Sequence, residues 1–181
     1  MTKVFINPGH CPGIDPGAIN AILGVTEADV VKIIGALVAD YLNKAGCEIE
    51  VIQSDNLYHD GQGTCVVDAA NRWAADIFIS LHCNAFDTHA QGTECCIFGA
   101  GGESEKLAQC IQRQIVDSLG TVDRGIKERP GLIVLKNTNM PAVLVELAFI
   151  DNADDVQLLI HKQEAFARAI ARGVTDYISR R

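Results

Sequence analysis

Short apolar runs alternate with amphipathic stretches along the chain, and this alternation constrains the fold more than any other feature of the sequence. The runs are rich in β-branched and aliphatic residues and have the length of buried strands. They predict strands at residues 3–7, 49–52, 76–82, 93–98, 132–135 and 142–145.

Between these runs, apolar residues recur at helical spacing. One helix is expected to begin at Glu27 and to be closed by Gly46, a residue type that commonly ends helices. Two more are expected at residues 65–75 and 103–119, and a terminal helical region follows Asp151-Asn152, which offers an N-cap. Strands that alternate with helices predict an α/β fold, with a twisted, mostly parallel mixed sheet of about six strands and helices on both faces.

Length and charge limit the class of protein. A chain of 181 residues that is 48% hydrophobic suits one domain, residues 1–181, with a sizeable core. Its 15 basic and 23 acidic residues give a net charge of −8 with no Lys/Arg-rich block, so we expect no nucleic-acid partner. No apolar run is long enough to span a membrane, and the early Asn7-Pro8 break predicts that no export signal is present.

The seven cysteines suggest a metal or disulfide framework, but their spacing argues against both. No C-x-x-C pair occurs, the number is odd, and most lie in apolar runs such as residues 94–98. We interpret them as small buried residues in a reducing compartment. Cys11 and Cys83 stand apart because each directly follows a histidine.

Residues that suit a metal occur where predicted strands end. His10 follows the first strand after a Gly/Pro-rich turn, His82 ends the run at 76–82, and Glu146 follows the run at 142–145. Sites of open α/β sheets gather at the carboxyl ends of the strands, and Glu27, in the first turn of a helix, can reach the same edge. Two histidines and a carboxylate form the ligand set of a catalytic zinc ion, and a carboxylate that does not bind the metal can transfer protons.

The residues alone leave a second interpretation of Glu146 open, in which it merely marks the exit of a strand into solvent. The four polar residues are also far apart in the chain, so no local motif such as H-E-x-x-H links them to one metal.

Other polar residues have simpler interpretations. We expect His59, His89 and His161 to be ordinary surface histidines, because they lie in polar, loop-like or helix-end settings. Asp15 is interpreted as a turn residue before Pro16, in preference to a partner of the metal ligands.

Two further polar residues belong to predicted loops. Arg124 could hold a substrate carboxylate, but an exposed loop arginine is the simpler interpretation. Asn84 is expected to support the site by hydrogen bonding.

The chain resembles the catalytic domain of the zinc-dependent N-acetylmuramoyl-L-alanine amidases, in the branch of cell-separation, sporulation and phage-lysin enzymes. The resemblance extends from about Val4 to Tyr177, and the order and spacing of its pieces make it specific. The matching pieces are Pro8-Gly9-His10, Asp15-Pro16-Gly17-Ala18, Glu27, Ala70-Asn71, residues 75–85, Gly92-Thr93-Glu94, Arg124-Gly125 and residues 141–152.

The resemblance implies roles for four residues. His10, Glu27 and His82 would bind one zinc ion, and Glu146 would be the catalytic carboxylate. The implied reaction is hydrolysis of the amide that joins N-acetylmuramic acid to the L-alanine of the peptidoglycan stem peptide. Two other functions stay open, namely a zinc peptidase-like hydrolase of another amide and a non-catalytic wall-binding module on the same fold.

The resemblance also bears on partners and location. Some relatives carry a helix that plugs the zinc site until a partner protein removes it, whereas here residues 92–94 lead promptly into the helix predicted at 103–119. We therefore expect an open site that needs no activator protein. We expect the chain to be cytoplasmic as synthesised and to act on the cell wall after release, as a phage or prophage lysin does. A catalytic fragment of a longer secreted protein would fit the same features.

Several positions depart from the family pattern. The family usually has Asp where Asn7 stands, Gly-Gly in place of Cys11-Pro12, and Ala in place of Cys83. Arginines near Ser54 and Val66 and a glycine at Ala148 are also missing. None of these changes removes a ligand, but Asn7 is expected to alter the contacts that orient His10, a kind of change worth about 10- to 100-fold in metal affinity or activity.

Overall fold

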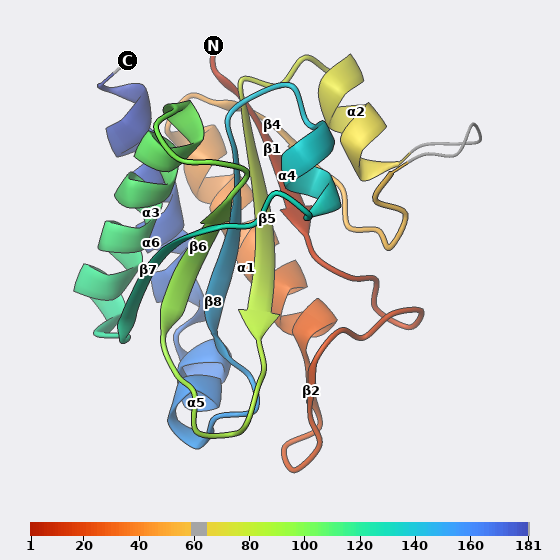
Figure 1. Cartoon of the computed structure of the whole chain (residues 1–181), viewed down its shortest axis with the longest axis vertical. Coiled ribbons are helices and arrows are strands. Elements are labelled where there is room, and N and C mark those ends of the chain that lie inside the picture. The colour runs from red at the N-terminus through yellow and green to blue at the C-terminus, as the bar shows by residue number, and fades with distance from the viewer. Residues whose placement is uncertain (59–64, 181) are drawn as a thin grey trace.

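A six-stranded sheet runs through the centre of the protein (Figure 1). The computed structural model describes residues 1–58 and 65–180, so His59 lies outside the described residues. The strand order is β4-β1-β5-β8-β6-β7, and all neighbouring pairs are parallel except β6 and β8. The strands are β1 (Lys3–Pro8), β4 (Glu48–Val51), β5 (Ile77–Asn84), β6 (Thr93–Ile97), β7 (Asp123–Glu128) and β8 (Ala142–Phe149).

Helices cover the two faces of the sheet unequally, as Figure 1 shows. One face packs against α1 (Glu27–Lys44), α3 (Glu103–Leu119) and α6 (Gln163–Ile178), with α5 (Ala153–His161) beside β8. Of the described helices, the other face carries only the short α2 (Val66–Arg72) and α4 (Ile133–Asn137), which lie over the amino-terminal part of the central strands. The predicted α/β fold is therefore confirmed, and one face keeps an area that none of the described helices covers.

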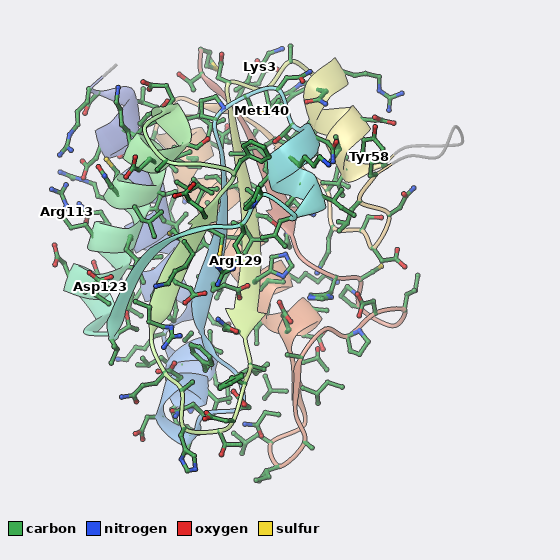
Figure 2. The ribbon with its side chains drawn as sticks, viewed as in Figure 1. Lys3, Tyr58, Arg113, Asp123, Arg129 and Met140 are labelled. Atoms are coloured by element: carbon green, nitrogen blue, oxygen red, sulfur yellow. The ribbon has the colours of Figure 1, made fainter. Side chains whose placement is uncertain are left out.

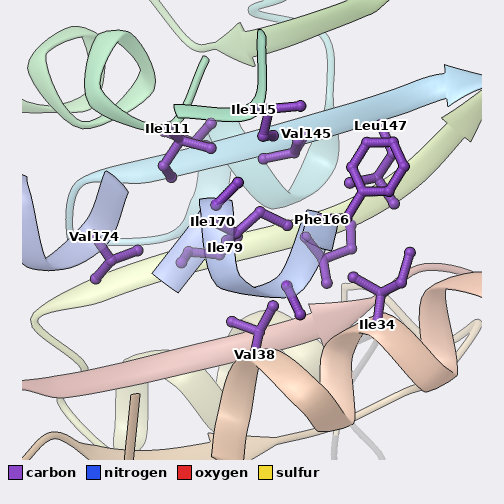
Figure 3. Close-up of a cluster of buried hydrophobic side chains, with 14 of the residues drawn as sticks. Ile34, Val38, Ile79, Ile111, Ile115, Val145, Leu147, Phe166, Ile170 and Val174 are labelled. Carbon is purple, nitrogen blue, oxygen red and sulfur yellow. The ribbon is translucent and has the colours of Figure 1, made fainter. Parts of the chain in front are cut away.

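The larger part of the core lies between the sheet and the three long helices, where apolar side chains interdigitate (Figure 3). Gly173 lets α6 approach α3 closely, because a Cβ at this position would lie 2.6 Å from Ile111 Cα. The side chains that meet here include Ile34, Val38, Ile79, Ile111, Ile115, Val145, Leu147, Phe166, Ile170 and Val174.

Helix ends follow the chemistry of their residues. The Thr26 side chain accepts a hydrogen bond from the Asp29 N–H and caps α1. Asn152 caps α5 by accepting from the N–H groups of Asp154 and Asp155, which confirms the predicted N-cap. None of the described helices is long and apolar enough to cross a membrane.

Two strand predictions are wrong. Residues 132–135 begin the short helix α4 instead of forming a strand, because a short apolar run has no periodicity that separates the two structures. The sixth strand is β7, whose sequence of mostly charged residues carries no apolar pattern. Such composition is typical of edge strands, which charged side chains protect from pairing with other chains.

Other boundaries differ from the predictions. β8 continues to Phe149, so Glu146 lies inside the strand and not after it, and β5 likewise continues past His82 to Asn84. The second helix is limited to residues 66–72, and the terminal helical region divides into α5 and α6. A small antiparallel hairpin of β2 (Ile19–Asn20) and β3 (Val25–Thr26) precedes α1 and was not predicted.

Candidate metal centre

Three side chains from different elements converge at one point. His10 lies in the loop after β1, Glu27 is the first residue of α1, and His82 lies in β5. One potential ligand atom from each lies within 4.8 Å of the others. His10 Nε2 is 3.1 Å from Glu27 Oε2, and His82 Nδ1 is 2.9 Å from Glu27 Oε1.

The backbone of the loop after β1 sets the position of His10. The Gly9 N–H donates to the Leu81 carbonyl and keeps the chain beside β5, where a Cβ at Gly9 would overlap the His82 ring. His10 itself has φ of 60°, a left-handed conformation that is uncommon outside glycine. Paired backbone hydrogen bonds between Cys11 and Asp15 then close the turn.

Asp15 has two contacts. Its Oδ1 accepts the Gly17 N–H, as expected for a turn residue, and its Oδ2 lies 2.7 Å from His10 Nδ1. The second contact fixes the ring so that Nε2 faces Glu27. The interpretation of Asp15 as a turn residue alone is therefore incomplete, because it also orients His10.

Hydrogen bonds from the backbone hold both oxygens of the Glu27 carboxylate. Its Oε2 accepts the Ala18 N–H and its Oε1 accepts the Cys83 N–H, each at 2.9 Å. The side chain is almost fully buried, and these bonds leave little freedom for the carboxylate. Cys83 thus contributes its backbone, while its own side chain is buried in the core.

The electrostatics follow from this packing. The hydrogen bond to Glu27 raises the pKa of His10 to about 9. Burial lowers this pKa, and the contact with the Asp15 carboxylate raises it further. Burial alone would raise the pKa of the Glu27 carboxyl, but hydrogen bonds from His10 and His82 hold that pKa well below its usual range. A buried anion between two imidazole rings is a donor set that suits a divalent cation such as zinc.

Glu146 lies beside this group. Within the sheet it is paired in register with His82 of β5 and with Glu94 of β6. Paired residues of adjacent strands point to the same face, so Glu146 and His82 share the face that carries α2 and α4.

No described residue forms an ion pair with the Glu146 carboxylate. Burial raises its pKa to about 7, an effect that Glu27 and Glu94 strengthen and His82 opposes. Its Oε2 atom is buried and has no hydrogen-bond partner among the described residues. A carboxyl group with these properties is suited to take up and release a proton near neutral pH.

The sheet face that carries α2 and α4 changes from apolar to polar along the strands. On β5, the alternate residues Phe78, Ser80 and His82 point to the same side, and on β8 Leu144 precedes Glu146 on that side. The apolar residues Phe78 and Leu144 pack with α2 and α4, and His82 and Glu146 come after them along their strands. The candidate site is therefore on a sheet face near the carboxyl ends of the strands.

Asn7 does not contact His10. Its side chain is buried, its Nδ2 donates to the carbonyls of Ile52 and Pro8, and its Oδ1 accepts the Ser80 hydroxyl at 2.9 Å. The expectation that this residue belongs to the contacts that orient His10 is not supported, since Asp15 has that position.

Arg124 and Asn84 border the site. Arg124 lies in β7, so the loop interpretation is wrong. Its Nε donates to Glu94 Oε2 at 2.9 Å, and its guanidinium stacks 4.8 Å from the centre of the Phe149 ring. Asn84 accepts the Ala85 N–H with its side chain and the Ile150 N–H with its carbonyl, which supports the turn after β5.

The remaining predictions concern residues away from the ligands. His89 and His161 are exposed, as expected. The expectation that the site is open and needs no activator protein stays a prediction.

The chain belongs to the N-acetylmuramoyl-L-alanine amidase family, whose sequence profile matches residues 4–176. It is 35% identical over 180 residues to N-acetylmuramoyl-L-alanine amidase LytC of Bacillus subtilis, covering 96% of this chain but only 35% of LytC. It is 32% identical to the endolysin of Bacillus phage SPP1, covering 99% of this chain and 66% of that protein.

A solved structure agrees with this assignment. The N-acetylmuramoyl-L-alanine amidase of Clostridium difficile 630 superposes with a TM-score of 0.85 at 32% identity, over 98% of this chain and 97% of that one. Both the family and its catalytic-domain fold are thus shown, as the sequence resemblance implied.

Proposed function

We propose that this protein is a zinc-dependent amidase that hydrolyses the bond between the lactyl group of N-acetylmuramic acid and the L-alanine of the stem peptide. The observation that carries the proposal is the His10, Glu27 and His82 group together with Glu146 in the neighbouring strand, whose buried Oε2 has no hydrogen-bond partner among the described residues. Membership of the amidase family supports the substrate class.

In the proposed mechanism, His10, Glu27 and His82 hold the metal and Glu146 moves the protons. A zinc ion at such a site lowers the pKa of the attacking water and polarises the scissile carbonyl. Glu146 accepts the water proton at its carboxylate and delivers it to the departing amine of L-alanine. Burial raises the pKa of this carboxyl in the metal-free protein, which favours a group that both accepts and releases a proton.

The three remaining parts of the proposal concern the whole protein. We propose that residues 1–181 act as one catalytic domain and that this domain needs no activator protein. We also propose that the chain is made in the cytoplasm and reaches the cell wall after release. The similarity to a phage endolysin supports this route.

The decisive experiment combines metal analysis with mass spectrometry of digested peptidoglycan. Glu146→Gln is expected to retain zinc and lose turnover, whereas His82→Ala is expected to lose both. Cleavage at another amide would favour a zinc peptidase-like enzyme. Absence of bound zinc and of any product would favour a wall-binding module, and near wild-type turnover by Glu146→Gln would refute the role of this residue.

A further inference from the structure

Three basic side chains from one strand line a cleft beside Glu146. The cleft has a volume of about 380 Å³, and Glu146 and Glu94 lie on its wall. Its basic residues are Arg124, Lys127 and Arg129, at or just beyond β7. In a protein with a net charge of −8, this concentration of positive charge at the candidate site is unusual.

The strand register places these residues on the face of the sheet that holds Glu146. Lys127 is opposite Cys96 in β6, and Cys96 is two residues beyond Glu94, which is opposite Glu146. With strands about 4.8 Å apart and residues about 3.3 Å apart along each strand, the Cα atoms of Lys127 and Glu146 are about 12 Å apart. Figure 2 shows Arg129 over the middle of the sheet, whereas Asp123 at the other end of β7 lies near its edge.

The three cations differ in how they are neutralised. Arg124 is bound to Glu94 and stacked on Phe149, so its charge is already paired. Neither Lys127 nor Arg129 forms an ion pair with a described residue. The hydrogen bond that the Arg129 guanidinium makes is to the Glu128 carbonyl, at 3.3 Å.

Both side chains can reach the cleft from the solvent side. Arg129 is exposed and Lys127 is partly exposed. Arg129 directly follows β7, and its N–H still donates to the Ile97 carbonyl of β6, so the alternation of the strand extends to it. Arg129 and Lys127 therefore lie on the same side, whereas Glu128 between them points to the other side. Two free cations facing one cleft form a site for an anion, and a guanidinium can bind a carboxylate with two parallel hydrogen bonds.

We infer that Lys127 and Arg129 bind a carboxylate of the stem peptide and thereby make the enzyme selective for acidic stems. This inference rests on the proposed function. The residue that follows L-alanine in a stem peptide is a D-glutamate linked through its side chain, so its α-carboxylate is free unless it is amidated. An extended chain advances about 3.5 Å per residue, which brings this group within reach of the Lys127 side chain, whose Cα is about 12 Å from that of Glu146. By the same spacing the Arg129 Cα is about 16 Å from Glu146, and its longer side chain extends over the same cleft.

The test uses three synthetic muramyl tripeptides with the same sequence. The first has the free α-carboxylate on the second residue and an amidated C-terminus. The second has carboxamides at both positions, and the third has a free carboxylate at the C-terminus alone. These arms distinguish the two carboxylates that a stem peptide can offer.

The zinc-loaded wild-type protein is expected to hydrolyse the first peptide with a kcat/KM about tenfold or more above that for the second, since a hydrogen bond to a charged group is worth about 1.5–3 kcal/mol. The double substitution Lys127→Gln and Arg129→Gln should abolish this preference by slowing the first reaction alone. Lys32→Gln, which removes an exposed charge from α1 on the opposite face, is the matched control and should keep the preference.

The outcomes separate the inference from the proposed function. A wild-type preference for the third peptide that the double variant loses would support carboxylate binding and assign it to the C-terminus. Equal rates on all three peptides, or a preference that survives in the double variant, would overturn the inference and leave the amidase function intact. The inference would also be overturned if the double variant lost kcat/KM equally on charged and uncharged peptides. If the wild type hydrolysed none of the peptides, that result would count against the proposed function.

Discussion

Asp15 and His10 form a short contact, with Asp15 Oδ2 2.7 Å from His10 Nδ1. Since a histidine has two ring nitrogens, this contact leaves Nε2 to face the Glu27 carboxylate. A carboxylate bound to the far nitrogen of a metal-ligating histidine fixes its ring and increases its basicity. The same carboxylate also holds the turn through the Gly17 N–H.

Asp15→Ala is therefore expected to weaken zinc binding by about 10- to 100-fold. Asp15→Asn, which keeps an oxygen for the Gly17 N–H, should have a smaller effect. Zinc affinity measured by competition with a chromophoric chelator provides the test, and Asp117→Ala, an exposed change on α3, is the control. Unchanged affinity in Asp15→Ala would show that the contact does not orient the ligand.

Gly17→Ala should damage the metal centre directly. Gly17 has φ of 66°, and a Cβ here would lie 2.6 Å from both Glu27 Oε2 and His10 Cδ2. Gly13→Ala is a matched control, because Gly13 also has positive φ, 82°, but an added Cβ meets nothing within 4 Å. Both should lose about 1 to 2 kcal/mol of stability from backbone strain, and Gly17→Ala alone should lose zinc affinity, which calorimetric titration would measure.

The pH dependence of stability should reveal the state of Glu146 in the metal-free protein. Its pKa is raised from 4.5 to about 7, chiefly by burial. The folded state thus binds this proton more tightly than the unfolded chain, and the resulting stability, present below pH 4.5, is lost as the pH rises through 7. At about 1.4 kcal/mol per pKa unit, the loss is about 3 kcal/mol.

Glu146→Gln removes this titration. In the presence of a chelator, the variant's free energy of unfolding relative to wild type should increase by up to about 3 kcal/mol between pH 4.5 and pH 7.5. Urea unfolding at the two pH values measures the change, and Glu128→Gln, at an exposed residue, is the control. A difference between Glu146→Gln and wild type that stays constant with pH would contradict the prediction.

Gly173→Ala should loosen the contact between α3 and α6. The added Cβ would lie 2.6 Å from Ile111 Cα, which is backbone and cannot move without shifting a helix. Overpacking of this kind costs about 1–3 kcal/mol. Gly131→Ala, where a Cβ meets nothing within 4 Å, should be close to neutral, and thermal unfolding of the two variants tests the difference.

Most of the fold could be predicted from the sequence, because buried strands and helices require apolar residues at a regular spacing. α3 was predicted to the residue and β5 to within two residues at its end, since a long apolar stripe and an apolar run leave little ambiguity. β7 was missed because an edge strand needs few apolar residues, and the run at 132–135 was assigned to a strand because four residues are too few to show a period.

The candidate site divides in a similar way. Family resemblance identified His10, Glu27, His82 and Glu146, and the structure places the first three together with Glu146 in the adjacent strand. The contacts of Asp15 and Arg124 depend on the three-dimensional path of a turn and on the register of two strands. No local pattern encodes either, although the short spacing between His10 and Asp15 within one turn is a usable sign.

The unequal cover of the sheet has a consequence for how a polymer could be attacked. Because α2 and α4 lie over the amino-terminal part of the central strands, His82 and Glu146 lie on a part of the sheet face that no described helix covers. A polymer could lie across such a face from the side, without a free end having to thread into a tunnel. An amidase built in this way is suited to cut side branches in the interior of a cross-linked mesh.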